Sequence, residues 1–155
     1  MRKAIPARHL TAALIAAPIA AALPLHGAAA QEPTQQPAQT AALTIDLNAL
    51  QPSDRGCRFT FVATNELGGE LSRAAFELVL FDTDGMVSRL TVVDFKDLPQ
   101  GKTKVRQFDF SGIDCARIGR VLVNDSTECA GTGIDPRACI QNLKPRTRTE
   151  VVFGL

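Results

Sequence analysis

From residue 43 to the C-terminus, the chain is a series of short hydrophobic stretches separated by turn-forming residues. The stretches are rich in β-branched residues and phenylalanine, and several alternate between apolar and polar positions. Alternation of this kind buries one face of a strand, and Gly, Pro and Asp between the stretches favour turns. The pattern predicts an all-β fold, a sandwich or barrel of about seven strands. The predicted strands are 43–50, 57–64, 75–81, 87–95, 105–110, 118–124 and 149–155.

One segment of this region has the features of a helix start. It is DPRACIQN at 135–142, in which Asp135 is suited to cap a helix and Pro136 to occupy its first position. We expect a single short helical turn there.

The first 42 residues differ in composition from the remainder. Residues 1–30 have a basic start with Arg2 and Lys3, an alanine-rich apolar stretch shorter than the ~20 residues of a membrane span, and small residues at the end. This is the pattern of a secretory signal peptide. Residues 31–42, QEPTQQPAQTAA, lack apolar periodicity and predict a flexible leader. We therefore predict one domain at 43–155 in a periplasmic or secreted protein, with no transmembrane segment after signal cleavage.

Cleavage after residue 30 removes both histidines, His9 and His26, from a chain that also has no Trp and no Tyr. Without an imidazole, Ser-His-Asp and Cys-His catalysis and histidine-ligated zinc are excluded for the mature chain. No GxGxxG, P-loop or CxxC motif is present, and we predict no cofactor. The same cleavage lowers the 17 basic residues to 14, against 16 acidic ones, so that no nucleic-acid partner is indicated.

The four cysteines are an even number in a chain predicted to be exported, which favours structural disulfides over a metal or redox site. Four cysteines allow three pairings. In an immunoglobulin-like antiparallel order, Cys57 starts the second strand and Cys115 follows the fifth, so the two lie at the same end of the sandwich. The sixth strand then carries the chain to the other end, where Cys129 and Cys139 lie. We prefer the pairs Cys57–Cys115 and Cys129–Cys139.

The segment 57–110 resembles the FxLYD-type exported β-sandwich domains. LVLFD at 78–82 stands where that family has Phe-x-Leu-Tyr-Asp, with Leu78 in place of Phe and Phe81 in place of Tyr. A DG turn, an LPQG segment at 98–101 and Asn65 at the end of the preceding strand are similar to further positions of the family. The whole chain also resembles uncharacterised exported proteins of alphaproteobacteria. The resemblance implies an immunoglobulin-like fold with an adhesive, scaffold or envelope role, and it implies no catalytic residue.

The motif DTDG contains Asp82, Asp84 and Gly85 and has two interpretations. It could begin a calcium loop, but an EF-hand requires a glutamate at the twelfth position, and that position is Val93. A hairpin corner is favoured, with an aspartate capping the turn and Gly85 supplying a positive φ.

Two sets of basic residues alternate along predicted strands, the first formed by Lys102, Lys104 and Arg106 and the second lying at 144–148. Together they could form a basic patch that binds an anionic polymer or a membrane surface. The favoured interpretation is that they protect exposed strand edges against pairing with other chains. The acids Asp125, Glu128 and Asp135 could supply calcium ligands from loops, although solvated turn residues are the simpler explanation.

These observations predict an exported, non-catalytic β-sandwich that binds a protein of the cell envelope through its loops or an edge strand. The alternative is a carboxylate- or metal-dependent extracytoplasmic hydrolase or lyase. Two carboxylates converging in a concave pocket would favour this alternative. The oligomeric state is left open by the sequence.

Overall fold

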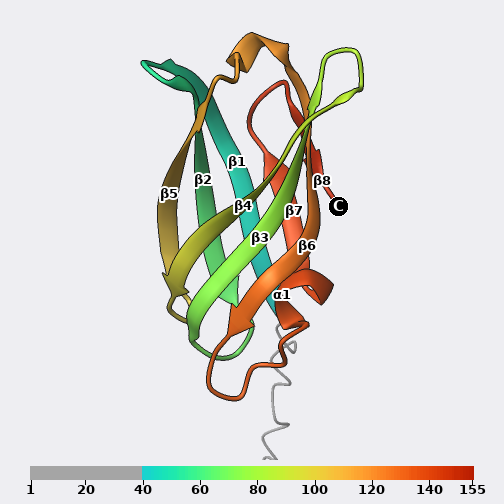
Figure 1. Cartoon of the computed structure of the whole chain (residues 1–155). Coiled ribbons are helices and arrows are strands. Elements are labelled where there is room, and N and C mark those ends of the chain that lie inside the picture. The colour runs from blue at the N-terminus through green and yellow to red at the C-terminus, as the bar shows by residue number, and fades with distance from the viewer. Residues whose placement is uncertain (1–39) are drawn as a thin grey trace, which may run out of the picture. The chain divides into compact units, whose positions relative to one another are not determined.

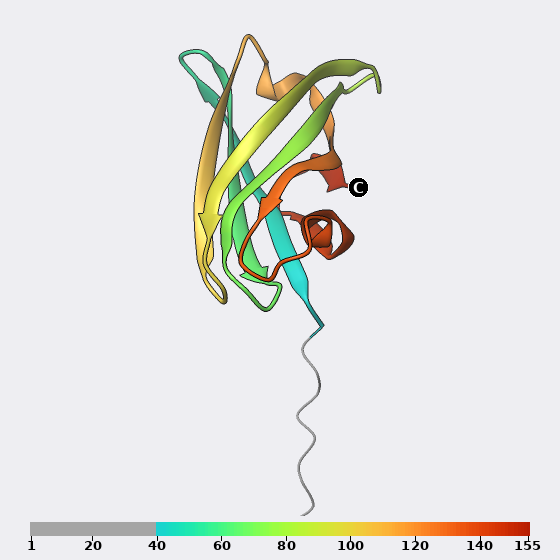
Figure 2. The same cartoon turned by 60° about the horizontal axis from the view of Figure 1, so that its bottom comes forward.

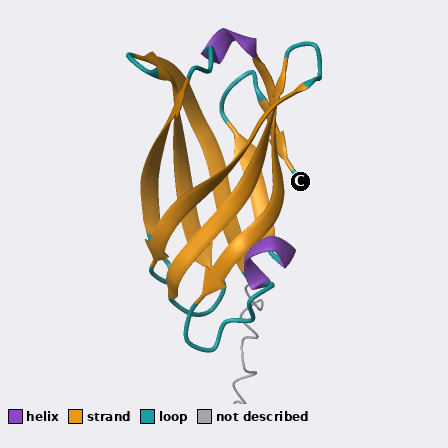
Figure 3. Ribbon diagram, viewed as in Figure 1, coloured by secondary structure: helices purple, strands orange, loops and turns teal. Residues whose placement is uncertain are grey.

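The computed structural model describes residues 40–155, which form two packed four-stranded sheets with short helices at the ends (Figures 1 and 3). Sheet A has the order β5-β2-β1-β7, and sheet B has the order β4-β3-β6-β8. The elements are β1 (Ala42–Ser53), β2 (Gly56–Glu66), β3 (Leu71–Asp82), β4 (Val87–Leu98), β5 (Thr103–Ser111), the 3-10 helix η1 (Cys115–Arg117), β6 (Ile118–Ala130), α1 (Ala138–Gln141), β7 (Leu143–Thr147) and β8 (Val152–Gly154). The predicted all-β sandwich is confirmed.

The core lies between the sheets and is centred on phenylalanines from both of them. Phe59 and Phe61 of β2 are fully buried, as are Phe76 of β3 and Phe95 of β4. The Phe61 and Phe95 ring centroids are 5.7 Å apart in an edge-to-face arrangement that joins the sheets. Burying one such ring stabilises the fold by about 1.5–3 kcal/mol relative to leaving it in water. The alternating strands of the sequence therefore supply the two inner faces.

The last part of the chain differs from the prediction, because it forms two short strands instead of one. β7 pairs in parallel with β1, and β8 pairs in parallel with β6, so that neither sheet is purely antiparallel. The sequence did not reveal β7 because Pro145 interrupts it. Proline lacks the N–H needed in a sheet interior, but it is tolerated on an edge strand, and β7 is the edge of sheet A.

The two disulfides pair as predicted, Cys57 with Cys115 and Cys129 with Cys139. Antiparallel pairing of β2 with β5 brings the start of one strand to the end of the other, and η1 then places Cys115 opposite Cys57. Cys139 lies in α1 and anchors this helix to β6 at the other end of the sandwich. Figure 2, in which that end comes forward, shows α1 beside β6.

The helix at 135–142 begins later than predicted. α1 starts at Ala138, and Arg137 occupies the cap position, two residues beyond the predicted Asp135. The Asp135 carboxylate accepts a hydrogen bond from the Arg137 N–H at 2.7 Å, so it stabilises the turn that leads into the helix.

The predicted domain boundary at residue 43 is close to the observed start, since β1 begins at Ala42. The predicted signal peptide and all but the end of the predicted leader lie outside the described residues. Within residues 40–155, no helix combines the length and the hydrophobicity required to span a bilayer.

Candidate interaction surface

Sheet B is apolar on part of its outer face as well as on its inner face. In β3, Leu78 and Leu80 point into the core, so the intervening Val79 and the following Phe81 point outward. The adjacent strands β4, β6 and β8 place further apolar side chains on the same outer face. We call this set the apolar face, and its members are Val79, Phe81, Val87, Leu90, Val92, Leu122 and Val152.

The strand register arranges the apolar face in rows. Val79 pairs with Leu90 on one side and with Leu122 on the other, which gives a central row across three strands. Leu90 remains 58% exposed and Val92 55% exposed, and Val152 at the margin is 59% exposed. The outward positions of a sandwich are ordinarily polar, and contiguous exposed apolar side chains mark sites of association. The face is therefore a candidate interaction surface.

Charged side chains lie on both sides of the central row. Toward the β3–β4 turn, the Arg120 guanidinium stacks over the Phe81 ring at 5.6 Å. On the opposite side, Glu77 pairs with Asp125 in the sheet register and accepts a hydrogen bond from the Asn124 amide at 2.6 Å. The apolar row is thus bordered by a basic group on one side and acidic groups on the other.

An ion-pair network covers the other half of the outer face of sheet B. Arg73 of β3 contacts Asp94 of β4 at 2.9 Å and Glu128 of β6 at 3.1 Å, and it thereby joins three strands. The hydrogen bond from Lys96, together with those from Arg73, holds the pKa of Asp94 well below its usual range. These charges satisfy one another, so this half of the face has no comparable exposed apolar group.

The ion pairs predict how stability depends on pH. Hydrogen bonds from Lys96, Lys104 and Arg58 lower the pKa values of Asp94, Asp97 and Asp109, respectively, in the folded state. A carboxylate with a lowered folded pKa stabilises the fold above its unfolded pKa of about 3.9 and loses that contribution as the pH falls. We expect urea midpoints to be level between about pH 5 and 8, because residues 40–155 contain no histidine, and to fall below about pH 4. A midpoint that rises on acidification would contradict this prediction.

The DTDG motif forms the β3–β4 turn, as the favoured interpretation predicted. The Asp82 carboxylate accepts hydrogen bonds from the N–H groups of Asp84 at 3.0 Å and Met86 at 2.9 Å, and Gly85 has a φ of 82°. One oxygen of Asp82 is thus used by the turn itself. No group of three or more His, Cys, Asp or Glu side chains able to hold a metal ion is found within residues 40–155, and Asp125, Glu128 and Asp135 form no such group.

The basic residues Lys102, Lys104 and Arg106 do not form an open patch. Lys102 precedes β5, while Lys104 and Arg106 lie on the inward side of this edge strand and both form ion pairs with Asp97 of β4. The Arg106 guanidinium also donates to the Phe95 carbonyl at 2.7 Å. The second basic set, at 144–148, lies in β7 and just after it, at the opposite edge of sheet A, so the two sets do not join. Both sets thus lie on or beside edge strands, and their protection of these edges against pairing with other chains stays a prediction.

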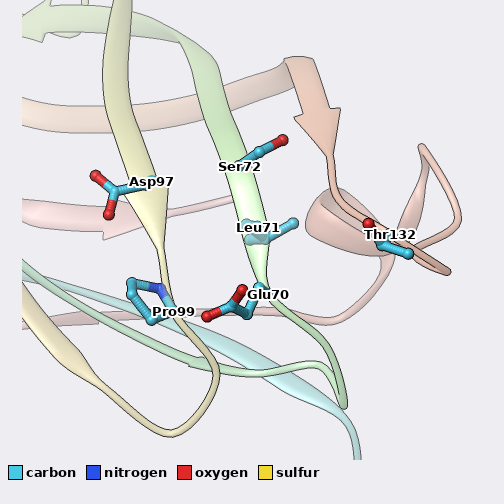
Figure 4. Close-up of a pocket in the computed structure, with 6 residues that line it drawn as sticks. All are labelled: Glu70, Leu71, Ser72, Asp97, Pro99 and Thr132. Carbon is cyan, nitrogen blue, oxygen red and sulfur yellow. The ribbon is translucent and has the colours of Figure 1, made fainter.

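The first of two pockets described for the sandwich has a volume of about 190 Å³ and lies near the start of β3 and the end of β4 (Figure 4). Glu70 and Asp97 are among its lining residues. Figure 4 shows that their carboxylates do not point toward one another, and Asp97 is held by Lys104 and Arg106.

The second pocket, of about 380 Å³, is lined by Asp82 and Asp114, among others. Each of these carboxylates accepts backbone hydrogen bonds in its own turn, Asp114 from the Ala116 N–H at 3.0 Å. Neither pocket therefore presents the converging carboxylates that would favour a hydrolase or lyase.

The apolar face was not predicted, although the sequence contains a signal for it. The stretch FELVLF at 76–81 has apolar residues on both of its alternating faces, and LTVV at 90–93 continues without a polar residue other than threonine. Strands that are apolar on both faces are typically covered on both faces. The outward apolar residues of these two stretches therefore indicate a face that another surface covers.

The sequence matches no protein-family model, and comparisons with curated proteins and with solved structures likewise find no match. The fold and the surface define the class of protein. Residues 40–155 form a disulfide-bonded β-sandwich with exposed apolar side chains on the outer face of one sheet. The resemblance to FxLYD-type domains stays a prediction.

Proposed function

We propose that the chain is an exported, non-catalytic binding module that attaches to a protein of the cell envelope through the apolar face of sheet B. The observation that carries the proposal is the exposure of Leu90, Val92 and Val152, which lie around the nearly buried Val79 on the outside of a sheet whose other side already fills the core. Apolar area left in water is stabilised when a partner covers it. A scaffold or adhesive role follows from this surface.

Two features support an extracytoplasmic location, either periplasmic or secreted. All four cysteines are in disulfides, which persist in oxidising compartments and are rare in the cytosol. Residues 1–30 have the composition of a secretory signal peptide.

We also propose that the sandwich is an immunoglobulin-like domain of the FxLYD type. Three of the residues on which the resemblance rests stabilise turns or strand ends, and members of one family would share such residues. Asp82 caps the β3–β4 turn, Gly101 adopts a positive φ of 68°, and Asn65 is fully buried and hydrogen-bonded at the end of β2. These roles support the resemblance at the level of the turn and strand ends.

The proposed function is tested by crosslinking in the exporting cell, followed by purification of the chain. We expect the unaltered chain to recover a protein reproducibly and the Leu90→Arg variant to lose about nine-tenths of that product, because a charge in the central row must be desolvated on binding. Val105→Arg is the matched control, since Val105 is 57% exposed but lies on the outer side of sheet A.

Equal recovery by the unaltered chain and Leu90→Arg would show that the apolar face is not the binding surface. No reproducible product from the unaltered chain would count against a binding module altogether. Both variants should retain the urea midpoint of the unaltered chain, because each replaced side chain is more than half exposed.

A further inference from the structure

We infer that the partner on the apolar face is a second copy of this chain, stacked face to face about a two-fold axis. The inference rests on the proposed function, namely that this face binds a protein, and it names the partner. The axis runs along the central row Leu90–Val79–Leu122, across the strands and between the two sheets. The strands of the two copies then run in opposite directions.

The central row is self-complementary under this axis. A residue on the axis faces the same residue of the other copy, so Leu90, which is 58% exposed, faces Leu90 and supplies most of the apolar contact, while Val79, which is 6% exposed, faces Val79. Sheets that pack face to face lie about 10 Å apart and keep their strand directions within about 30° of each other. Isologous contacts of this type are the commonest in homo-oligomers.

The charges beside the row are also complementary under the same axis. The two-fold axis places residues on one side of the central row opposite residues on the other side of that row in the second copy. Each strand lies over the same strand of the second copy. Arg120 precedes Leu122 on β6, and Asp125 follows it, so Arg120 of one copy lies opposite Asp125 of the other, and the pair occurs twice. On β4, the exchange places Val87 opposite Val92, which are both apolar and both 55% exposed.

The strand edges are less suited to self-association than the face. The edge of β4 is interrupted at Lys96, which has a φ of 62°, and the Arg106 side chain already binds the Phe95 carbonyl on that edge. β8 has only three residues, and β7 contains Pro145. Bulges, short strands, charged side chains and proline all discourage edge-to-edge pairing. The face of sheet B is therefore better suited to a second copy than these three edges.

Sedimentation velocity of the chain purified from the exporting cell tests the inference. Over a concentration series that reaches hundreds of micromolar, we expect a reversible monomer–dimer equilibrium, since an interface of this limited size gives modest affinity. Leu90→Arg should weaken the dimer at least about tenfold, and Val105→Arg should leave it unchanged.

A charge-reversal cycle tests the register of the two copies. Arg120→Glu and Asp125→Arg should each weaken the dimer about tenfold, because each places like charges opposite one another twice. The double variant should recover the affinity to within about threefold, as a reciprocal pair requires. Failure of the double variant to recover would overturn the proposed axis.

A chain that remains monomeric throughout the series would overturn the inference as a whole. If such a monomeric chain still yields a crosslinked foreign protein that Leu90→Arg abolishes, the proposed function stands and only the identity of the partner is wrong. If it yields no crosslinked product at all, both fail. The two failures are thereby distinguished.

Discussion

Replacing Cys57 and Cys115 together by alanine should lower the free energy of unfolding by about 4 kcal/mol. The disulfide joins residues separated by 58 positions, and a bridge restricts the unfolded chain more strongly when it closes a longer loop. It also fixes η1 to the start of β2, and the Cys57 side chain is fully buried there. Urea denaturation followed by circular dichroism measures the effect, which should shift the midpoint by at least 1 M at an ordinary slope of about 1–3 kcal/mol per M.

The other disulfide provides the matched comparison. Cys129–Cys139 spans 10 positions, so its replacement by alanines should cost about 3 kcal/mol, less than the first pair. Both variants remove two cysteines and leave no free thiol behind. An equal or reversed ranking would show that the loop length does not govern the stabilisation, and that local packing around α1 matters more.

The disulfide pairing could be predicted because it depends on features that the sequence expresses directly. Alternation locates β2 and β5, and the rule that antiparallel neighbours join start to end then places Cys57 and Cys115 together. The β3–β4 turn was equally accessible, because Asp82 and Gly85 have the chemistry that a tight turn requires. Local patterns were sufficient for these elements.

Other elements depend on contacts between distant residues, which a local pattern does not express. β7 pairs with β1 across about 100 positions, and Pro145 hides it from any propensity argument. Lys104 and Arg106 share the inward side of β5 with Phe108, which is half-buried, and they fit there because Asp97 lies across the gap between the sheets. Only the packing of the two sheets shows that Asp97 is the ion-pair partner of Lys104 and Arg106.

The apolar face depends both on a local sequence pattern and on contacts between distant residues. Val79 and Leu90 are visible in the sequence as apolar residues within the predicted strands 75–81 and 87–95. Their formation of a continuous row required the register between β3 and β4. The sequence of one strand shows which residues can lie on a surface. The register between paired strands shows which of these residues are neighbours on it.

Replacing Asn65 by leucine should destabilise the fold by about 4 kcal/mol, the second large effect that we expect. Asn65 is fully buried, and its amide nitrogen donates to the Gly69 and Leu98 carbonyls, each at 2.8 Å, while its oxygen accepts from the Leu67 N–H at 3.0 Å. A leucine side chain would leave these three backbone groups without their partners, and each such loss costs about 1–3 kcal/mol. The side chain thus connects the end of β2, the following turn and the end of β4.

Asn124→Leu is the control for this prediction, because Asn124 is exposed and makes a single side-chain hydrogen bond, to Glu77. Its effect on the urea midpoint should correspond to about 0.5 kcal/mol or less. Asn65→Asp adds a test of chemistry at nearly constant volume. The introduced carboxylate would face two carbonyl oxygens, which raises its folded pKa, so the variant should be weakest at neutral pH and should recover in part as the pH falls through that pKa. If Asn65→Leu matches Asn124→Leu, or if Asn65→Asp shows no such recovery, the hydrogen bonds of Asn65 do not hold these segments together.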